Sequence, residues 1–292
     1  MFPKISIVTP SFNQGAYLEE TILSVIGQNY PNLEYIIIDG GSKDNSIEII
    51  KKYEKYLTYW ISENDDGQAD AINKGFQIAT GDLFGWLNSD DIYMPNVFNR
   101  IISSKPKSLD FIFFGEAIHF RSNVNSISSF GSNVYNSFLS NSLNLAESFI
   151  QPSTFWSKSV WIKYGPLQKN LFYTFDWIYF LTLLKNNVEF VYINMPISLY
   201  RLHDKQKTQK FNNIRFNEIY NILFDNNVEL AKVYNHLYYD KYIFNRNYFK
   251  ILKRVLQAFH FKSSDAILIK ILRFSKYKNI SIEKIQRLLF LL

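Results

Sequence analysis

Residues 81–91, GDLFGWLNSDD, form a short apolar run that stops at two adjacent acids, Asp90 and Asp91. A short apolar run that follows a glycine is typical of a buried β-strand. Two carboxylates about 4 Å apart repel each other by roughly 4 kcal/mol at an effective dielectric constant of about 20. Ionising both acids at a partly buried strand end therefore requires a compensating cation, unless the pair only forms a turn before the next helix.

Strands and helices alternate on the N-terminal side of this run. Residues 5–8 (ISIV) and 34–39 (EYIIID) have the pattern of buried strands, and the residues between them place apolar side chains on one helical face. A capping-box pattern at 45–48 opens a second helix. A strand near 58–62 and a helix over about 68–79 follow. This order predicts an α/β fold with a mostly parallel sheet that helices cover on both faces.

Polar clusters follow three of the predicted strands, at residues 10–13 (PSFN), 39–42 (DGGS) and 88–91 (NSDD). Because ligands of parallel α/β sheets bind beyond the carboxyl ends of the strands, we expect these clusters to line one cleft. A site of oxygen ligands with one or two carboxylates suits Mg²⁺ or Mn²⁺. The sequence contains neither a P-loop nor a G-x-G-x-x-G fingerprint, so a bound nucleotide would depend mainly on a metal to hold its diphosphate.

Composition limits the class of protein. The chain has 292 residues, no cysteine and 17% aromatic residues, so it can form a sizeable core but no disulfide and no thiolate metal site. Its first ten residues lack the pattern of a signal peptide, and no apolar run approaches the roughly 18 to 20 residues of a membrane span. These features predict a cytoplasmic protein.

Two long stretches, 5–46 (ISIVTPSFNQGAYLEETILSVIGQNYPNLEYIIIDGGSKDNS) and 62–91 (SENDDGQADAINKGFQIATGDLFGWLNSDD), closely resemble glycosyltransferase family 2. The resemblance implies a GT-A fold with a Rossmann-like sheet and an enzyme that transfers a sugar, with inversion, from a nucleoside-diphosphate sugar to an acceptor hydroxyl. It also implies a GT-A domain at 1–205, with a nucleotide-binding part over about 1–95 and an acceptor part over about 96–205. The resemblance fades beyond this point, and the composition of residues 206–292 predicts a basic, aromatic-rich helical region.

The resemblance implies nucleotide-sugar contacts at several positions. Residues 9–11 match the loop that contacts the nucleoside, and Asp39 matches the acid that hydrogen-bonds the base, commonly uracil. Gln151 opens a QPS element that lies near the sugar in the family, although the same residues could form an ordinary strand edge. The matched residues are Thr9, Pro10, Ser11, Asp39, Asp65, Asp70, Asn73, Asp90 and Gln151.

Asp90 and Asp91 match the metal motif of the family, which is written D-x-D or a close variant. By that resemblance the cofactor is Mn²⁺ or Mg²⁺, Asp91 is its direct ligand, and Asp90 is a ribose or water-mediated contact. His203 matches a histidine that completes the metal site or touches the diphosphate; the alternative is a structural or exposed histidine. Three cations nearby could also hold phosphate or only solvate a loop: Arg201, Lys205 and Lys207.

Asp176, in the run FYTFDWIYFLTLL, matches the acid that takes the proton of the acceptor hydroxyl. Many relatives have Glu-Asp at this point, whereas this chain has Phe175 before the aspartate, and a helix-capping role is the alternative. The presence of four of the matched acids together, Asp39, Asp90, Asp91 and Asp176, disfavours a non-catalytic scaffold. The sequence lacks the Q-x-x-R-W motif of processive synthases, which favours single transfers, and the resemblance implies a role in bacterial polysaccharide, O-antigen or capsule biosynthesis.

Residues 241–292 carry twelve Lys or Arg against two acids, about +10, so the preceding residues carry about −4. Basic residues mixed with Leu, Ile and Phe at helical spacing are typical of amphipathic helices on an anionic membrane. Such a contact, at the inner face of the cell membrane, would fit a glycan acceptor on a polyprenyl diphosphate. The alternative is packing onto the catalytic domain or onto a second subunit of a homo-oligomer. A nucleic-acid partner is disfavoured, because the aromatic residues share stripes with Leu and Ile.

Overall fold

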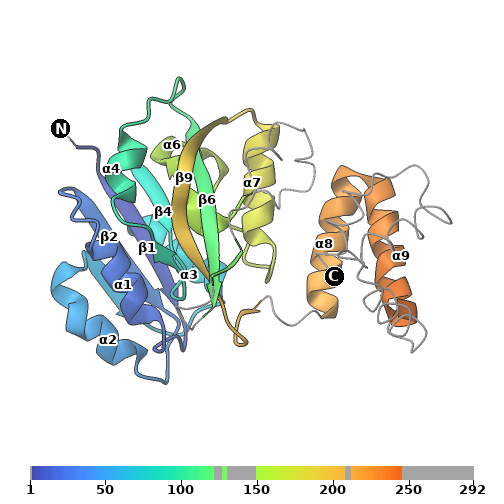
Figure 1. Ribbon diagram of the computed structural model, residues 1–292, viewed down its shortest axis with the longest axis horizontal. Helices are drawn as coiled ribbons and strands as arrows, with labels where there is room; N and C mark the ends of the chain where they lie inside the picture. The colour runs from blue at the N-terminus through green and yellow to red at the C-terminus, as the bar shows by residue number, and fades with distance from the viewer. Residues whose placement is uncertain (1, 122–126, 130–148, 208–211, 245–292) are drawn as a thin grey trace. The chain divides into compact units, whose positions relative to one another are not determined.

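The chain divides into two compact units, residues 1–210 and 211–292, and each is described by itself. In this computed structural model the described residues are 2–121, 127–129, 149–207 and 212–244 (Figure 1). Most of the basic segment 241–292 therefore lies outside the described residues. None of the helices within the described ranges is both long enough and apolar enough to cross a bilayer.

In the first unit, the strands of the described residues form one sheet in the order β3-β2-β1-β4-β8-β6-β9-β5, with β7 paired to β6 (Figure 1). Their bounds are β1 Ile5–Ser11, β2 Leu33–Asp39, β3 Tyr59–Ser62, β4 Leu83–Trp86, β5 Ile92–Tyr93, β6 Phe111–Arg121, β7 Ile127–Ser129, β8 Thr154–Ser157 and β9 Glu189–Leu202. The first four strands in this order pair in parallel, as the sequence predicted. The other half of the sheet is mixed, because β8 runs antiparallel to both β4 and β6.

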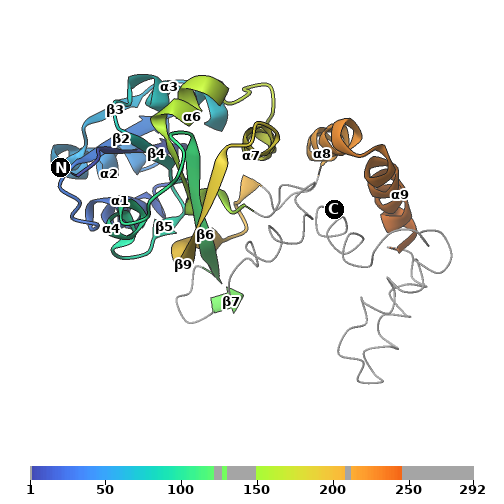
Figure 2. The same cartoon turned by 90° about the horizontal axis from the view of Figure 1, so that it is seen from above.

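Helices cover both faces of this sheet. Their bounds are α1 Leu18–Ile26, α2 Ser46–Tyr53, α3 Gln68–Ile78, α4 Val97–Ile102, α6 Lys158–Tyr164 and α7 Phe175–Lys185. Because successive side chains of a strand point to opposite faces, Ile7 packs in the core formed with α1, α2 and α4, and Val8 packs in the core formed with α3, α6 and α7. Figure 2 shows α3 and α6 on one side of the sheet and α1 and α4 on the other. The predicted α/β fold is confirmed.

The start of α2 differs in detail from the predicted capping box. Asn45 occupies the N-cap position, but its side chain makes no capping hydrogen bond. The carboxylate of Asp44 instead accepts hydrogen bonds from the amide of Ser46, at 3.0 Å, and from the amide of Gly15, at 2.9 Å. Asp44 thus ties α2 to the loop after β1, a long-range contact that the local pattern does not reveal.

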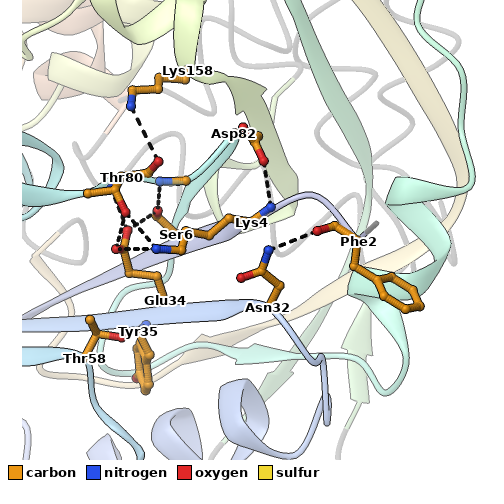
Figure 3. A network of polar contacts seen from close by, with 11 residues as sticks. Phe2, Lys4, Ser6, Asn32, Glu34, Tyr35, Thr58, Thr80, Asp82 and Lys158 are labelled. Atoms are coloured by element: carbon orange, nitrogen blue, oxygen red, sulfur yellow. Dashed lines mark hydrogen bonds and ion pairs between the residues drawn. The ribbon is translucent and has the colours of Figure 1, made fainter.

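A polar network at the amino ends of the strands fixes β1, β2 and β4 relative to one another (Figure 3). Buried Glu34 accepts hydrogen bonds from the hydroxyl of Ser6, at 2.5 Å, and from the amide and hydroxyl of Thr80, both at 2.7 Å. Lys4 Nζ lies 3.5 Å from the same carboxylate. Burial by itself would raise the pKa of Glu34, but these hydrogen bonds and the charge of Lys4 lower it below 4.5.

The described part of the second unit is a pair of helices, α8 Asn213–Asn226 and α9 Val228–Phe244. The side chain of Asn212 accepts a hydrogen bond from the amide of Arg215 at 3.0 Å and caps α8. Phe216 of α8 stacks on two rings of α9, Tyr234 at 5.2 Å and Tyr238 at 4.1 Å between centroids. Aromatic packing therefore joins the two helices.

Candidate functional site

The carboxyl ends of β1, β2 and β4 lie side by side, because β1 pairs in parallel with both of the other strands. Ser11 at the end of β1 lies opposite Asp39 at the end of β2. This juxtaposition brings the first two polar clusters to one edge of the sheet. It is the edge at which parallel α/β sheets bind ligands.

Asp39 is fully buried, and both of its carboxylate oxygens accept hydrogen bonds from the protein. The donors of these bonds are the amides of Gly41 and Ser42 and the hydroxyls of Ser42 and Ser62. Thr9 is also fully buried, and its hydroxyl lies 3.1 Å from the hydroxyl of Tyr35. Asp39 and Thr9 therefore hold the strand ends together, and the contacts with the nucleoside and its base that the resemblance implied for them stay predictions.

Phe12 projects from the loop after β1 and is 59% exposed. Asn13, with φ of 52°, fixes this loop: its amide donates to Ser42 Oγ at 2.7 Å, and its side chain accepts from the amide of Lys43 at 2.8 Å. Buried Ser11, next to Phe12, has a hydroxyl with no hydrogen-bond partner among the described residues. Sequence reasoning missed Phe12; an aromatic residue inside a polar strand-end cluster was the available signal.

Asp65 lies against the same strand end. A side chain added to Gly40, the residue after β2, would come within 2.8 Å of Asp65 Oδ2. Asp65 Oδ1 accepts a hydrogen bond from the amide of Gly67 at 2.8 Å. Burial raises the pKa of Asp65, although the hydrogen bond from Gly67 opposes the increase. Of the three predicted contacts Asp65, Asp70 and Asn73, Asp65 is thus the one that adjoins the loop after β2.

Asp70 makes a hydrogen bond and ion pairs with other residues of the protein. Its carboxylate accepts a hydrogen bond from the amide of Asp66 at 3.1 Å, and it lies 3.1 Å from Lys169 Nζ and 3.4 Å from Lys74 Nζ. Burial would raise the pKa of Asp70, but the Asp66 amide and the two lysines lower it below its usual value. This set of contacts favours a structural role over the expected contact with a nucleotide sugar.

Asn73 joins α3 to the segment before α7. Its side-chain amide donates to the carbonyl of Leu167 at 2.9 Å, and its side-chain oxygen accepts from the amide of Leu167 at 2.8 Å. Both polar atoms of the side chain are therefore used by one buried residue. The geometry favours a positioning role for Asn73 over the expected direct contact with the sugar nucleotide.

The acids after β4 meet the end of β9. Strand β5 follows Asp91 directly and pairs with Ser198 and Leu199 of β9, which brings the residues after β9 next to the acids. As a result Asp90 Oδ2 lies 3.0 Å from His203 Nε2. The side chains of Asp90 and His203 are 17% and 4% exposed. The two residues are 113 positions apart in sequence, and the structure brings their side chains into contact; their role as metal ligands stays a prediction.

Asp91 has different surroundings from Asp90. It is 1% exposed, and its two oxygens accept hydrogen bonds from the backbone amide of Arg201, at 3.1 Å, and the side-chain amide of Asn88, at 3.3 Å. Burial, together with the charge of Asp90, raises the pKa of Asp91 well above its usual range. This geometry differs from the expectation that Asp91 is the more direct metal ligand, because its oxygens face the protein interior.

The family resemblance implies a divalent ion at this site, and two side chains offer atoms that could bind it. Asp90 offers a carboxylate and His203 an imidazole, and His203 Nδ1 is buried without a hydrogen-bond partner among the described residues. Within those residues no group of three or more His, Asp or Glu side chains is arranged to hold a metal. Because Mg²⁺ and similar cations can be bound by one or two carboxylates together with substrate phosphates, a two-residue donor set fits such an ion.

Gln151, in the short 3₁₀ turn Gln151–Ser153 just before β8, supports the segment that carries the two acids after β4. Its side-chain amide donates to the carbonyl of Trp86 at 2.7 Å, and its oxygen accepts from Asn88 at 3.1 Å. The oxygen of Asn88 in turn accepts from Gln68 at 2.8 Å, and Gln68 accepts from Lys207 at 3.3 Å. The side chains of Gln151, Asn88, Gln68 and Lys207 therefore form a continuous series of hydrogen bonds across the strand ends. Gln151 therefore holds Asn88, two residues before Asp90.

Asp176 is the second residue of α7, whose N-cap position is Thr174. Its carboxylate accepts a hydrogen bond from the amide of Trp177 at 2.8 Å. The segment before it is joined to the strand ends by Lys207, whose Nζ lies 3.9 Å from the ring centroid of Phe172 and 5.3 Å from that of Phe175. Asp176, which is half-buried, thus lies on a segment that contacts Lys207, and Lys207 is connected to Asn88 through Gln68.

Comparisons with known proteins agree with this architecture. The family model for glycosyl transferase family 2 matches residues 6–164, more than half of the chain. Uncharacterised glycosyltransferases of Rickettsia typhi and Mycobacterium tuberculosis are 37% identical over 101 residues and 42% identical over 104 residues. Each match covers 35% of this chain, and they cover 31% and 40% of the relatives. The similarity thus spans only about a third of these curated relatives.

Solved structures share the fold. Residues 1–349 of S. aureus TarS superpose with a TM-score of 0.59 at 14% identity, covering 98% of this chain and 90% of that one. The mannosyltransferase PcManGT from Pyrobaculum calidifontis, solved with GDP-Man and Mn²⁺, gives a TM-score of 0.56 at 15% identity and covers 100% of this chain and 86% of that one. At these identities the likeness concerns the fold.

The α/β sheet, with its polar strand ends and the acids after β4, has the architecture of a GT-A glycosyltransferase. The family model for glycosyl transferase family 2 spans this sheet from β1 to α6, residues 6–164. The chain belongs to glycosyl transferase family 2.

Proposed function

We propose that this protein transfers a sugar, with inversion, from a nucleoside-diphosphate sugar to an acceptor hydroxyl with the help of Mn²⁺ or Mg²⁺. The observation that carries the proposal is the 3.0 Å approach of Asp90 to His203 at the carboxyl ends of the parallel strands. An acid and an imidazole at this edge match the requirement for a divalent ion beside a diphosphate.

The donor that we propose is a UDP-sugar. One solved TarS complex contains UDP-GlcNAc, and the PcManGT complex contains GDP-Man and Mn²⁺; these complexes support a nucleotide-sugar donor. The exposed ring of Phe12 beside Ser11 can stack on a base. Asp65, next to Gly40, can accept a hydrogen bond from that base, while Asp39 keeps the intervening loop in position.

In the proposed reaction the acceptor oxygen bonds to the anomeric carbon as the bond from that carbon to the diphosphate breaks. The diphosphate leaves with the bonding electron pair, and the Asp176 carboxylate takes the proton of the acceptor hydroxyl. Asp90 and His203 would hold the divalent ion, which supplies positive charge that stabilises the leaving diphosphate. Asp91 keeps Asp90 in position, so the roles of the two acids are exchanged relative to the sequence expectation.

The acceptor that we propose is a bacterial glycan, carried on a polyprenyl diphosphate and modified one sugar at a time. The excess of basic over acidic residues in 241–292 supports a peripheral contact with anionic lipid. A catalytic domain held at the inner membrane face would meet such a lipid-linked acceptor.

A thermal-shift panel tests the donor and the metal together. The protein is heated with UDP-, GDP- and dTDP-sugars, each with Mn²⁺ and with EDTA. A ligand at 100 times its dissociation constant stabilises the folded state by about 2.7 kcal/mol. Selective stabilisation by UDP-sugars that requires Mn²⁺ is the expected result. Equal stabilisation in EDTA would contradict the metal role, and a preference for another nucleotide would contradict the donor.

A further inference from the structure

Arg201, near the end of β9, is a buried cation. It is 3% exposed, and its guanidinium carbon lies 4.9 Å from the ring centroid of Tyr17 and 4.6 Å from that of Phe120. Burying a charge is costly unless the charge is paired and hydrogen-bonded. A guanidinium held between two aromatic rings is therefore expected to have a defined set of partners.

Those partners belong to the acidic motif and to helix α1. Arg201 Nε donates to the carbonyl of Asp90 at 2.8 Å, and Nη2 donates to Glu20 Oε2 at 2.6 Å. The backbone amide of Arg201 donates to the carboxylate of Asp91 at 3.1 Å. One residue therefore contacts both acids and links them to α1. These side-chain contacts use Nε and Nη2 of the guanidinium, and a contact of Arg201 with phosphate stays a prediction.

The first turn of α1 and the residue before it contact the same motif at two further points. Thr21 Oγ1 donates to the carbonyl of Asp91 at 2.8 Å. The ring of Tyr17 packs on the ring of His203, with centroids 4.5 Å apart. Helix α1 thus reaches the carbonyl of Asp91 directly, the carbonyl of Asp90 through Arg201, and His203 through Tyr17.

We propose that Arg201, held by Glu20, is a positioning residue that sets the geometry of Asp90 and His203 and thereby the affinity for the divalent ion. The inference rests on the proposed function of that pair. Groups that orient metal ligands typically change metal affinity or activity by about 10- to 100-fold when they are removed. An arginine suits the task because its planar fork reaches two acceptors at once, which a lysine does not.

The substitution Glu20→Gln tests the inference with little risk to folding, because the Glu20 side chain is 57% exposed. The matched control is Glu19→Gln, which removes the neighbouring carboxylate of α1; Glu19 is 41% exposed and pairs with Lys52 at 2.5 Å, away from the acidic motif. The dissociation constant of Mn²⁺ is measured by electron paramagnetic resonance at saturating UDP, and thermal stability is measured in EDTA. Arg201→Lys is the second variant.

Glu20→Gln is expected to raise the dissociation constant of Mn²⁺ about 10-fold, with kcat restored at high Mn²⁺ and with a single cooperative unfolding transition retained in EDTA. Arg201→Lys is expected to raise it further, and Glu19→Gln to leave it at the wild-type value. If Glu20→Gln and Arg201→Lys both keep the wild-type affinity for Mn²⁺, the inference about Arg201 is overturned and the proposed metal role is not. Absence of Mn²⁺ binding by the wild-type protein overturns the inference and the metal role together.

Discussion

Asp90 and Asp91 are adjacent in sequence but have opposite surroundings. Asp91 is 1% exposed and accepts hydrogen bonds from the protein, whereas the carboxylate of Asp90 meets His203 and keeps 17% of its side chain exposed. Adjacent side chains that leave a strand end in different directions can divide their tasks in this way. We therefore assign the ligand role to Asp90 and the anchoring role to Asp91.

Substituting each acid by alanine should separate these roles. Asp90→Ala is expected to lower kcat by about 100-fold or more, the size of effect seen when one charge-stabilising group is lost, with little change in stability. Asp91→Ala should destabilise the protein by about 1 to 3 kcal/mol, because the buried backbone amide of Arg201 loses its acceptor. Denaturant unfolding in EDTA and steady-state kinetics measure the two effects. Equal stability losses in both variants would contradict the assignment.

Asp176 is expected to act on the acceptor and not on the donor. Asp176→Asn keeps the size of the side chain and removes its capacity to take a proton, so kcat should fall by about 10² to 10⁴. The dissociation constant of UDP with Mn²⁺, measured by calorimetry, should stay at the wild-type value. Wild-type turnover of the variant would remove the base role, and weakened UDP binding would move Asp176 to the donor side.

At the scale of elements, α3 holds the segment between α6 and α7. Asn73 makes two hydrogen bonds with Leu167, and Lys169 pairs with both Asp66 and Asp70. The same segment leads to Asp176 at the start of α7. Helix α3 therefore fixes the distance between the strand ends and the proposed acceptor side.

Asn73→Ala should weaken this attachment. The variant leaves the amide and carbonyl of buried Leu167 without their partners, so we expect a loss of about 1 to 3 kcal/mol in unfolding free energy. The KM for the acceptor should rise while the dissociation constant of UDP stays the same, because the change lies on the acceptor side. Weaker UDP binding with unchanged stability would instead support the direct nucleotide-sugar contact expected from the sequence.

The order of strands and helices along residues 5–91 was predictable, because each element has a local pattern of apolar side chains. The hydrogen bonds between elements were not. Asp39 and Asn73 have the residue types of ligand contacts, yet the structure uses them to join loops. Pairing of β5 with β9, which brings His203 to Asp90, depends on residues more than 100 positions apart. No local pattern encodes such a contact, and only the family resemblance indicated it.

At the scale of the whole molecule, Glu34 makes the stability of the fold depend on pH. Its pKa is lowered in the folded protein, so the folded state favours the ionised carboxylate. The resulting stability is fully present above the ordinary pKa of about 4.5 and is lost as the pH falls through the lowered value. The melting-temperature difference between the wild type and Glu34→Gln should therefore be largest at pH 7 and shrink below about pH 4.5. A difference that does not vary with pH would contradict this account.

Residues 245–292 carry eleven Lys or Arg against two acids, about +9, which exceeds the net charge of +6 of the whole chain. Each basic residue near an anionic surface contributes about 1 kcal/mol to binding. Full-length protein is therefore expected to float with vesicles that contain phosphatidylserine, less so at high salt, and a variant that ends at residue 244 should remain at the bottom of the gradient. Unchanged flotation of the shortened variant, or binding to RNA without binding to vesicles, would contradict the membrane proposal.

Strand β9 lies inside the sheet, between β6 and β5, and leads directly to His203. Among the strands of the described residues it is the last to leave the ribosome during biosynthesis. A nascent chain that stops before residue 189 lacks both an interior strand and His203. We expect such a chain to depend on chaperones and to ignore nucleotide sugars, so competence for catalysis would arise only when the sheet closes.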